Sequence, residues 1–204
     1  MTPQEIRNER LAETLIHNLH RRHIQGFYCP TAAEAVQKVS QLIEDGSSVT
    51  WGGTMTVRDI GIPGYLRNRR TLEVLDRDLA TTPEQKQAIY LKAFTADVYL
   101  TSANAISEDG VIVNIDGNGN RVAAITWGPK KVIFVIGLNK VAQMSRLLLP
   151  VLAARQRPSM PQGSTSQLPA TSMARAITAI PHRRSATTFT SSATLPMVAT
   201  SSCW

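Results

Sequence analysis

The sequence predicts an α/β fold in which helices cover both faces of a mostly parallel sheet, with a β-hairpin late in the chain. Segments with helical periodicity alternate with short apolar runs in the first part of the chain, and this alternation is typical of parallel sheets. One apolar run passes into a helical segment through Gly52 and Gly53, as a strand–turn–helix unit. Two later runs flank residues 116–120, which are glycine, asparagine and aspartate, a composition typical of hairpin turns.

The predicted elements begin with an amphipathic helix over residues 3–23, whose apolar side chains recur at helical spacing. Residues 24–28 combine β-branched and aromatic side chains, which favour a short strand. A second helix begins after Thr31, because Thr31 and Glu34 have the spacing of a capping box. Gly46 is expected to end this helix.

The next elements continue the alternation. A short buried strand is predicted at residues 48–51, followed by the two glycines and a helix over residues 55–60. Residues 72–75 form another predicted strand. A helix is expected over residues 83–94, because it starts with proline in the first turn and a glutamate beside it.

The second half of the chain is richer in predicted strands, which are residues 96–100, 111–115, 121–126 and 131–136. Residues 116–120 join the second and third of these strands as a hairpin. Residues 140–149 are compatible with a helix. We expect one domain over residues 1–150.

The C-terminal tail, residues 151–204, has a different composition. It is rich in Ser, Thr, Ala, Pro and Arg, and it has no sustained period and no acidic residue. Such a segment cannot bury enough apolar surface to offset its ordering entropy. We therefore predict a disordered or aberrant tail that adds little to the fold after about residue 143.

The net charge of +7 does not indicate a nucleic-acid partner, because most of the excess belongs to the tail. Residues 1–150 contain 17 Lys and Arg against 15 Asp and Glu, whereas residues 151–204 contain five arginines and no acid. The two cysteines, Cys29 and Cys203, have no metal spacing and no disulfide framework. No apolar run approaches a membrane span or a signal sequence. We expect a cytoplasmic protein with neither a nucleic-acid nor a membrane partner.

The first candidate site is the run Gly52, Gly53, Thr54, Met55 and Thr56, where a strand meets a helix. Glycines let an anion approach the backbone, and N–H groups at the start of a helix attract it. The alternative is a tight turn with a threonine cap and no ligand. The run matches neither a Walker motif nor a dinucleotide-binding fingerprint.

The second candidate site is a polar cluster formed by Asn104, Glu108, Asp109, Asn114 and Asp116. A carboxylate held in a cleft can act as a general base or bind ligand hydroxyls, so Glu108 and Asp109 are the candidate catalytic residues. The alternative is that the Asp-Gly pairs are ordinary turns.

The predicted ligand-binding set joins the two motifs. Besides the residues 52–56, it contains Asn104, Asn114, Asp116, Gly117, Gly119, Asn120 and Arg121. Arg58, Asp59 and Lys140 are charges near the same glycines, but isolated charges are more often solvated. His20 and His23 are spaced like a metal pair, but nothing in the sequence completes a site, so no metal is expected.

Five runs of the sequence together resemble the LUD (lactate utilization) domain family. They are residues 49–56, 96–106, 108–110, 113–124 and 128–132, and the resemblance extends from about residue 4 to residue 143. The family implies an α/β fold like that of the ribose-5-phosphate isomerase and CoA-transferase superfamily. It also implies a link to bacterial oxidation of L-lactate to pyruvate, beside iron–sulfur subunits. It does not supply a settled catalytic residue.

Residues 102–117 are also similar to a segment shared by methylthioribose-phosphate isomerases and translation-factor 2B subunits. An aspartate usually stands there where this chain has Asn104. An amide cannot accept a proton as a carboxylate does. The departure therefore favours binding over isomerase chemistry at this position.

The tail departs from the resembled family, whose subgroup continues with an acidic helix and a Cys-rich end. Suppose that one nucleotide was lost just before the codon of Met144. Read in the original frame, the codons of residues 144–148 can then encode Asp-Val-Glu-Ala-Ala. Residues 170–179 would permit Cys-His-Val-Asp-Gly-Ala-Cys-His-His-Cys, and residues 185–189 Ile-Cys-Asn-Tyr-Phe. Because the three strings lie in one frame and in order, we interpret the tail as frameshifted; the alternative is a natural low-complexity tail.

These observations lead to one functional hypothesis and two alternatives. The first is a lactate-utilization-type protein that binds a small anionic metabolite or cofactor in a glycine-lined cleft. The second is an enzyme that acts on a sugar phosphate or acyl-CoA, with Glu108 or Asp109 as base. The third is a non-enzymatic assembly partner of iron–sulfur subunits. The identity of a cofactor and the formation of a homo-oligomer stay open.

Overall fold

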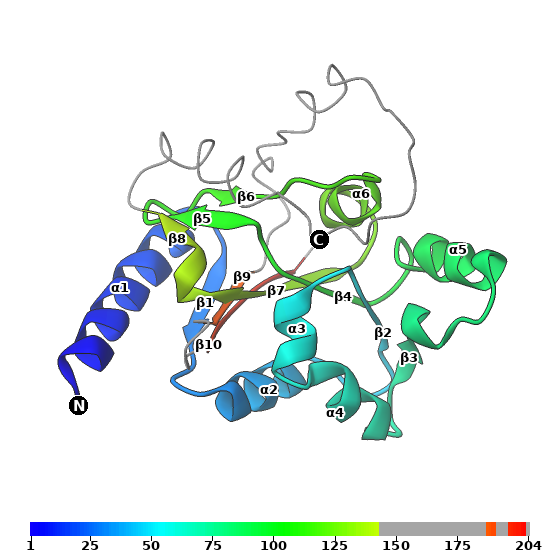
Figure 1. Ribbon diagram of the computed structural model, residues 1–204, viewed down its shortest axis with the longest axis horizontal. Coiled ribbons are helices and arrows are strands. Elements are labelled where there is room, and N and C mark those ends of the chain that lie inside the picture. The colour runs from blue at the N-terminus through cyan, green and yellow to red at the C-terminus, as the bar shows by residue number, and fades with distance from the viewer. Residues whose placement is uncertain (143–186, 191–195, 203–204) are drawn as a thin grey trace, which may run out of the picture.

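A mostly parallel sheet forms the centre of the fold (Figure 1). The computed structural model of the chain describes residues 1–142, 187–190 and 196–202. Four of the strands are parallel neighbours in the order β7-β4-β2-β3. They are β2 (Ser48–Trp51), β3 (Glu73–Leu75), β4 (Val98–Thr101) and β7 (Lys131–Gly137).

Three further strands complete the sheet on the other side of β7, in the order β1-β10-β9. They are β1 (Gln25–Tyr28), β9 (Thr187–Thr190) and β10 (Pro196–Ser202). β10 is antiparallel to both β1 and β7. β9 and β10 belong to the tail, so their place in the sheet departs from the expectation that residues after about 143 add little to the fold. The other residues of the tail lie outside the described residues, and so does most of the predicted helix over residues 140–149.

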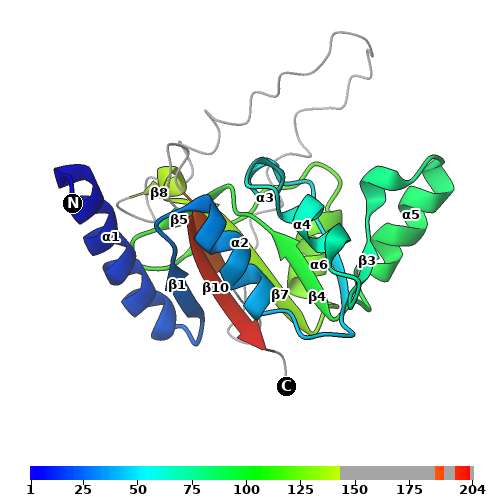
Figure 2. The same ribbon diagram turned by 90° about the horizontal axis from the view of Figure 1, so that it is seen from below.

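Helices and a small second sheet cover the two faces of the central sheet (Figures 1 and 2). One face packs against α1 (Pro3–His20), α6 (Asn120–Thr126) and the small sheet. The other face packs against α2 (Ala32–Gln41), α3 (Met55–Asp59) and α4 (Ile62–Asn68). α5 (Pro83–Lys92) lies beside the β3 edge. The predicted α/β class is thus confirmed.

The side chains of β7 show why both faces need cover. Val132, Phe134 and Ile136 belong to the core on the α1 and α6 face, whereas Ile133 and Val135 belong to the core on the α2 to α4 face. A strand alternates its side chains between the faces of a sheet, and all five of these are buried. This continuous apolar run is typical of a parallel sheet covered on both sides.

Thr31 caps the second helix as predicted, but the capping box is incomplete, because the Glu34 carboxylate accepts from the Thr31 hydroxyl rather than from its backbone N–H. The side chains of Thr31 and Thr82 accept hydrogen bonds from the backbone N–H groups of Glu34 and Gln85, and Thr2 does the same for Glu5. The second helix ends earlier than predicted, at Gln41. No helix in the described part of the chain is long and apolar enough to span a membrane.

One predicted strand is wrong, because residues 121–126 lie in the helix α6. The carboxylate of Asp116 accepts hydrogen bonds from the backbone N–H groups of Arg121 and Val122, at 2.7 and 3.2 Å. Two orphan donors of a first helical turn are satisfied in this way. The consecutive burial of Ala124 and Ile125 also fits a helix better than a strand that alternates.

The antiparallel hairpin lies one segment earlier than predicted. β5 (Ala105–Ser107) and β6 (Ile112–Val113) pair antiparallel around the turn at residues 108–110. β8 (Val141–Ala142) pairs parallel with β5 and completes the small sheet. Residues 140–142 are therefore a short 3-10 end and a strand rather than the start of a helix.

Asp97 joins the starts of β2 and β4, and its charge makes the stability depend on pH. Its carboxylate contacts Nζ of Lys130 at 2.6 Å and accepts hydrogen bonds from N and Oγ of Ser48 at 2.8 and 2.7 Å. The hydrogen bond from Lys130, followed by those from Ser48, lowers the pKa of Asp97 from 3.8 to about 2. Because the pKa is lower in the folded chain than in the unfolded chain, the Asp97 carboxylate stabilises the fold at pH values above about 4. This contribution is lost as the pH falls from about 4 to about 2.

We expect Asp97→Asn to lower the free energy of unfolding at pH 7 by about 1 kcal/mol, since the carboxylate is partly exposed. The variant should also lose part of the slope of stability against pH between about 4 and 2. Urea denaturation followed by circular dichroism across this range measures both effects. Asp59→Asn, at an exposed position, is the matched control. Equal slopes for both variants contradict the assignment.

Candidate functional site

The carboxyl ends of the parallel strands bring four loops to one edge of the sheet. Trp51 pairs with Leu100, and Leu100 pairs with Ile133, so β2 and β4 end side by side, next to β7, which continues to Gly137. Gly52 and Gly53 follow β2, and Arg77 follows β3. Residues 102–104 follow β4, and Lys140 follows β7. Ligands of open α/β sheets bind at this edge.

A pocket of about 320 Å³ lies at this edge, on the side of β2 and β3. We call it the Arg77–Arg121 pocket. Its lining residues are Gly53, Arg77, Tyr90, Asn104, Ile115, Asp116, Gly117, Asn118, Asn120 and Arg121. Both predicted motifs therefore contribute to one pocket, together with residues near β3 that the sequence did not indicate.

Arg121 is the central cation of the pocket. Its Nη2 atom donates to Oδ1 of Asn104 at 2.8 Å and to the carbonyl oxygen of Ile115 at 2.6 Å. Burial lowers the pKa of Arg121, and the nearby charge of Asp116 opposes this effect. Within the described residues, no carboxylate forms a salt bridge with Arg121. Its Nη2 hydrogens are used, and Nε and Nη1 have no described partner.

Asp116 holds the loop that carries Arg121. Besides the N–H groups of the α6 start, its Oδ1 atom accepts from the N–H of Asn118 at 3.3 Å. Asn104 also accepts from the N–H of Ile115 at 2.9 Å. The two side chains therefore fix the backbone of this loop, while both still line the pocket.

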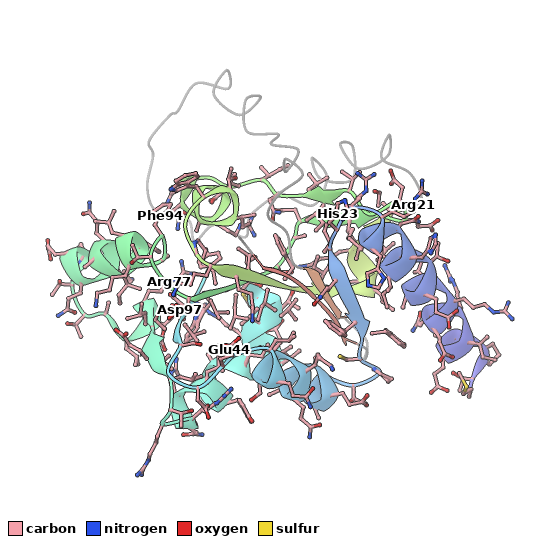
Figure 3. All side chains as sticks on the ribbon, turned by 180° about the vertical axis from the view of Figure 1, so that it is seen from behind. Arg21, His23, Glu44, Arg77, Phe94 and Asp97 are labelled. Atoms are coloured by element: carbon pink, nitrogen blue, oxygen red, sulfur yellow. The ribbon has the colours of Figure 1, made fainter. Side chains whose placement is uncertain are left out.

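Arg77 supplies a second cation from the 3-10 helix η1 (Arg77–Leu79), which follows β3. It lies on the side of the sheet that carries α5 (Figure 3). Nη1 of Arg77 donates to the hydroxyl of Tyr90 at 3.2 Å, and the guanidinium lies 5.5 Å from the centre of the Tyr90 ring. Nε of Arg77 is 3.8 Å from the carboxylate of Asp78, which also binds Arg58 at 2.7 Å.

Tyr99 lies behind this pocket on β4 and is 3% exposed. A Cβ atom on Gly52 would lie 2.6 Å from the Tyr99 hydroxyl and 3.4 Å from the Arg121 side chain. Burial raises the pKa of Tyr99 to about 12. The sequence did not indicate this residue, since an aromatic side chain in a strand is most often only part of the core.

A second polar cluster, Thr56, Ser102 and Lys140, lies on the β7 side of the same edge. Nζ of Lys140 donates to Oγ of Ser102 at 2.7 Å and to Oγ1 of Thr56 at 3.1 Å. Ser102 is buried, and the other two side chains are half-buried. Lys140, which the sequence suggested to be a solvated charge, is thus tied to the threonine of the first motif.

Glu108 and Asp109 are not brought to the Arg77–Arg121 pocket. They lie at the opposite end of β5 from Asn104, against the last turn of α1. Asn18 donates to the carbonyl oxygen of Glu108 at 2.8 Å, and Arg22 donates to that of Asp109 at 2.9 Å. The carboxylate of Asp109 is 3.6 Å from Arg22 and lines a separate pocket there. The two candidate catalytic residues therefore do not line the pocket to which Gly53 and Asn104 contribute.

The other residues of the first motif have different environments. Oγ1 of Thr54 accepts from the N–H of Val57 and caps α3, and Met55 is 68% exposed. Because α3 has only five residues, its dipole adds little to anion binding. The positive charge at this edge comes from Arg77, Arg121 and Lys140 instead.

In the second motif, Asn114 and Gly119 do not line the pocket. Asn114 is buried, and neither polar atom of its amide has a hydrogen-bond partner among the described residues. Gly119 is the residue before α6 and has a positive φ of 76°. Gly117 and Asn120 do line the pocket.

The fold and the site define an α/β protein with a cationic pocket at the carboxyl edge of a parallel sheet. The model of the LUD domain family matches residues 12–179, which is most of the chain. The chain belongs to the LUD domain family, and it is therefore a lactate-utilization-related protein. No curated protein matches it.

Proposed function

We propose that this lactate-utilization-type protein binds a small anionic metabolite in the Arg77–Arg121 pocket. The observation that carries the proposal is the half-used guanidinium of Arg121, whose two bonded partners are neutral oxygens. A cation that is largely removed from water gains most from a partner of opposite charge. A carboxylate or phosphate oxygen can accept a charge-assisted hydrogen bond from Nε or from Nη1, which have no described partner.

The size and charge of the pocket support a small ligand. Its volume of about 320 Å³ lies at the lower end of the range for small-molecule sites, which fits a metabolite of a few carbon atoms better than a nucleotide cofactor. Arg77 adds a second positive charge from a different element. Asp116, the carboxylate among the lining residues, is already bonded to three backbone N–H groups.

The family supports the wider role. We infer a part in the oxidation of L-lactate to pyruvate, with iron–sulfur subunits as partners and a cytoplasmic location. An enzyme that uses Glu108 or Asp109 as base at this pocket is not favoured, because neither residue lines it. An assembly protein without a ligand is the remaining alternative.

Thermal unfolding with added anions tests the proposal. L-lactate, pyruvate and inorganic phosphate are compared with sodium chloride at equal ionic strength. Binding to the native state adds about 2.7 kcal/mol at a ligand concentration of 100 Kd, so at least one anion should raise Tm beyond the effect of salt. No specific rise with any of the three contradicts the proposal and favours the assembly role.

Gly53→Val should weaken anion binding about tenfold, because the anion would lose roughly one charge-assisted hydrogen bond from Arg77. A Cβ atom at this position would lie 2.9 Å from Nη2 of Arg77. Since that contact is with the end of a flexible side chain, the arginine can move out of the pocket and the fold survives.

Isothermal titration with the anion that raises Tm most measures the Gly53→Val effect. Gly64→Val is the matched control, because a Cβ atom there has no neighbour within 4 Å. Equal affinity of both variants for the anion contradicts the assignment of Gly53 and Arg77 to the site.

A further inference from the structure

We propose that Ser102 is a nucleophile for acyl groups and that Lys140 is its general base. The reaction class is the hydrolysis of a carboxylic ester. Neither residue lines the Arg77–Arg121 pocket, so this activity goes beyond the proposed function and does not depend on it. Three features of the cluster formed by Thr56, Ser102 and Lys140 support it.

The first feature is the direct contact between the nucleophile and the base. Nζ of Lys140 lies 2.7 Å from Oγ of Ser102 and 3.1 Å from Oγ1 of Thr56. In enzymes, an activated serine lies within hydrogen-bond reach of a base, and a third group orients that base. Serine–lysine pairs are one form of this arrangement. In this cluster Thr56 is the positioning residue, because it holds the amine of Lys140 from the other side.

The second feature is the place of the cluster in the sheet. β2 and β4 are parallel neighbours, but the chain passes from β2 to β3 on one side of this pair and from β4 to β7 on the other. Ligands of open α/β sheets bind at such a switch point, outside the carboxyl ends of the strands. Ser102 directly follows β4, and Thr56 follows β2 in the first turn of α3. The cluster therefore lies where this kind of fold places its reactive groups.

The third feature is the unusual partner of a buried serine. Ser102 is 2% exposed, whereas Thr56 and Lys140 are half-buried and connect it to the surface. Most side-chain hydrogen bonds in proteins go to the backbone or to water. The buried Ser107 follows this rule, since its Oγ accepts from the N–H of Val111 at 3.0 Å. Ser102 instead has an amine as its closest bonded partner, and an amine can take the proton of the hydroxyl.

The reaction needs water as its only co-reactant. Oγ of Ser102 forms a bond to the carbonyl carbon of the ester, and its proton moves to Nζ of Lys140. Lysines serve as general bases in enzymes in this way, in the neutral amine form. The bond between the carbonyl carbon and the alcohol oxygen then breaks, and Lys140 returns the proton to that oxygen. Water attacks the acyl-serine with the same proton transfers, which releases the acid and restores Ser102.

Two acylating or phosphonylating probes test the proposal on the full chain. A fluorophosphonate forms a bond between its phosphorus and Oγ of the nucleophile, and fluoride leaves. p-Nitrophenyl acetate transfers its acetyl group and releases p-nitrophenolate. We expect mass spectrometry of the digested wild-type chain to locate the added group on Ser102. Modification of Ser102 by either probe supports the proposal, and modification by neither overturns it. This measurement needs no variant, so it decides the question even if a variant fails to fold.

Substitutions of Lys140 separate a base from a structural contact. Lys140→Met should slow the modification of Ser102 about 100-fold, which is at the lower end of the contribution of a general base. Lys140→Arg keeps the charge and the donors but cannot accept a proton, so it should be equally slow. Lys131→Met is the control, because Lys131 is also half-buried but donates to the carbonyl oxygen of Leu42. A wild-type rate in either variant of Lys140 overturns its role as the base.

Substitutions of the two hydroxyl residues complete the test. Ser102→Ala should remove the modified peptide, whereas Ser107→Ala should leave the modification of Ser102 unchanged. Thr56→Val should slow the modification about tenfold, as for one lost hydrogen bond to a charged group, and Thr56→Ser should restore it. Equal rates in the two variants of Thr56 contradict its positioning role. Circular dichroism reports whether each variant is folded.

Discussion

Gly128→Ala is expected to destabilise the fold by about 3–5 kcal/mol, the sum of a backbone strain and a steric clash. Gly128 has a φ of +135°, and a Cβ atom there would lie 2.6 Å from Cα and 2.7 Å from the carbonyl oxygen of Phe94. Phe94 follows α5 and is labelled in Figure 3. Since the contact is with backbone atoms, no side-chain rotation relieves it, and the connection between α6 and β7 must shift.

Urea denaturation measures this cost, with Gly46→Ala as control. Gly46 also has a positive φ, of +83°, but a Cβ atom there has no neighbour within 4 Å. The control variant therefore carries the strain of the left-handed conformation alone, about 1–2 kcal/mol. Equal destabilisation by the two substitutions would show that the close approach to Phe94 is unimportant.

Arg121→Met is expected to have the largest effect on ligand affinity, a loss of about 30- to 100-fold for every anion that binds the pocket, as for a charge-assisted hydrogen bond. Methionine keeps much of the apolar stem near Gly52 and removes the charge. The fold is expected to survive, since Asn104 keeps its hydrogen bond from the N–H of Ile115 and Asp116 still caps α6.

Titration with lactate, pyruvate and phosphate measures the Arg121→Met effect. Arg70→Met is the matched control, because Arg70 is exposed and its removal changes the net charge equally. A similar loss in both variants would mean that the general field of the protein, rather than the pocket, attracts anions. Unchanged affinity in Arg121→Met would remove the basis of the proposed function.

The sequence predicted the parallel core and most helices, because periodicity and caps are local signals. β2 was predicted with its exact ends, and the Thr31 cap has the expected hydrogen bond. Residues 121–126 were assigned to the wrong element because the deciding interaction comes from Asp116, five residues before Arg121 in the first turn of α6. Apolar composition alone does not separate a short helix from a short strand.

The candidate site was predicted in part. Glycines and clustered amides drew attention to Gly53, Asn104 and Arg121, which the fold does bring together. Arg77 has no motif of its own, and its place in the pocket depends on the pairing of β3 with β2. Glu108 is close to Asn104 in sequence, but the extended strand β5 between them carries it away from the pocket.

The two walls of the pocket are anchored with different strength. Arg121 extends from α6, which buries Ala124 and Ile125 in the main core. Arg77 and Tyr90 belong to η1 and α5, where no residue is buried, and they join the sheet through the three-residue edge strand β3. Elements with few buried contacts open at low free energy without global unfolding. Part of the binding free energy of any ligand must therefore be spent on holding α5 closed, and amide hydrogen exchange in α5 should report occupancy of the pocket more sensitively than exchange in β4.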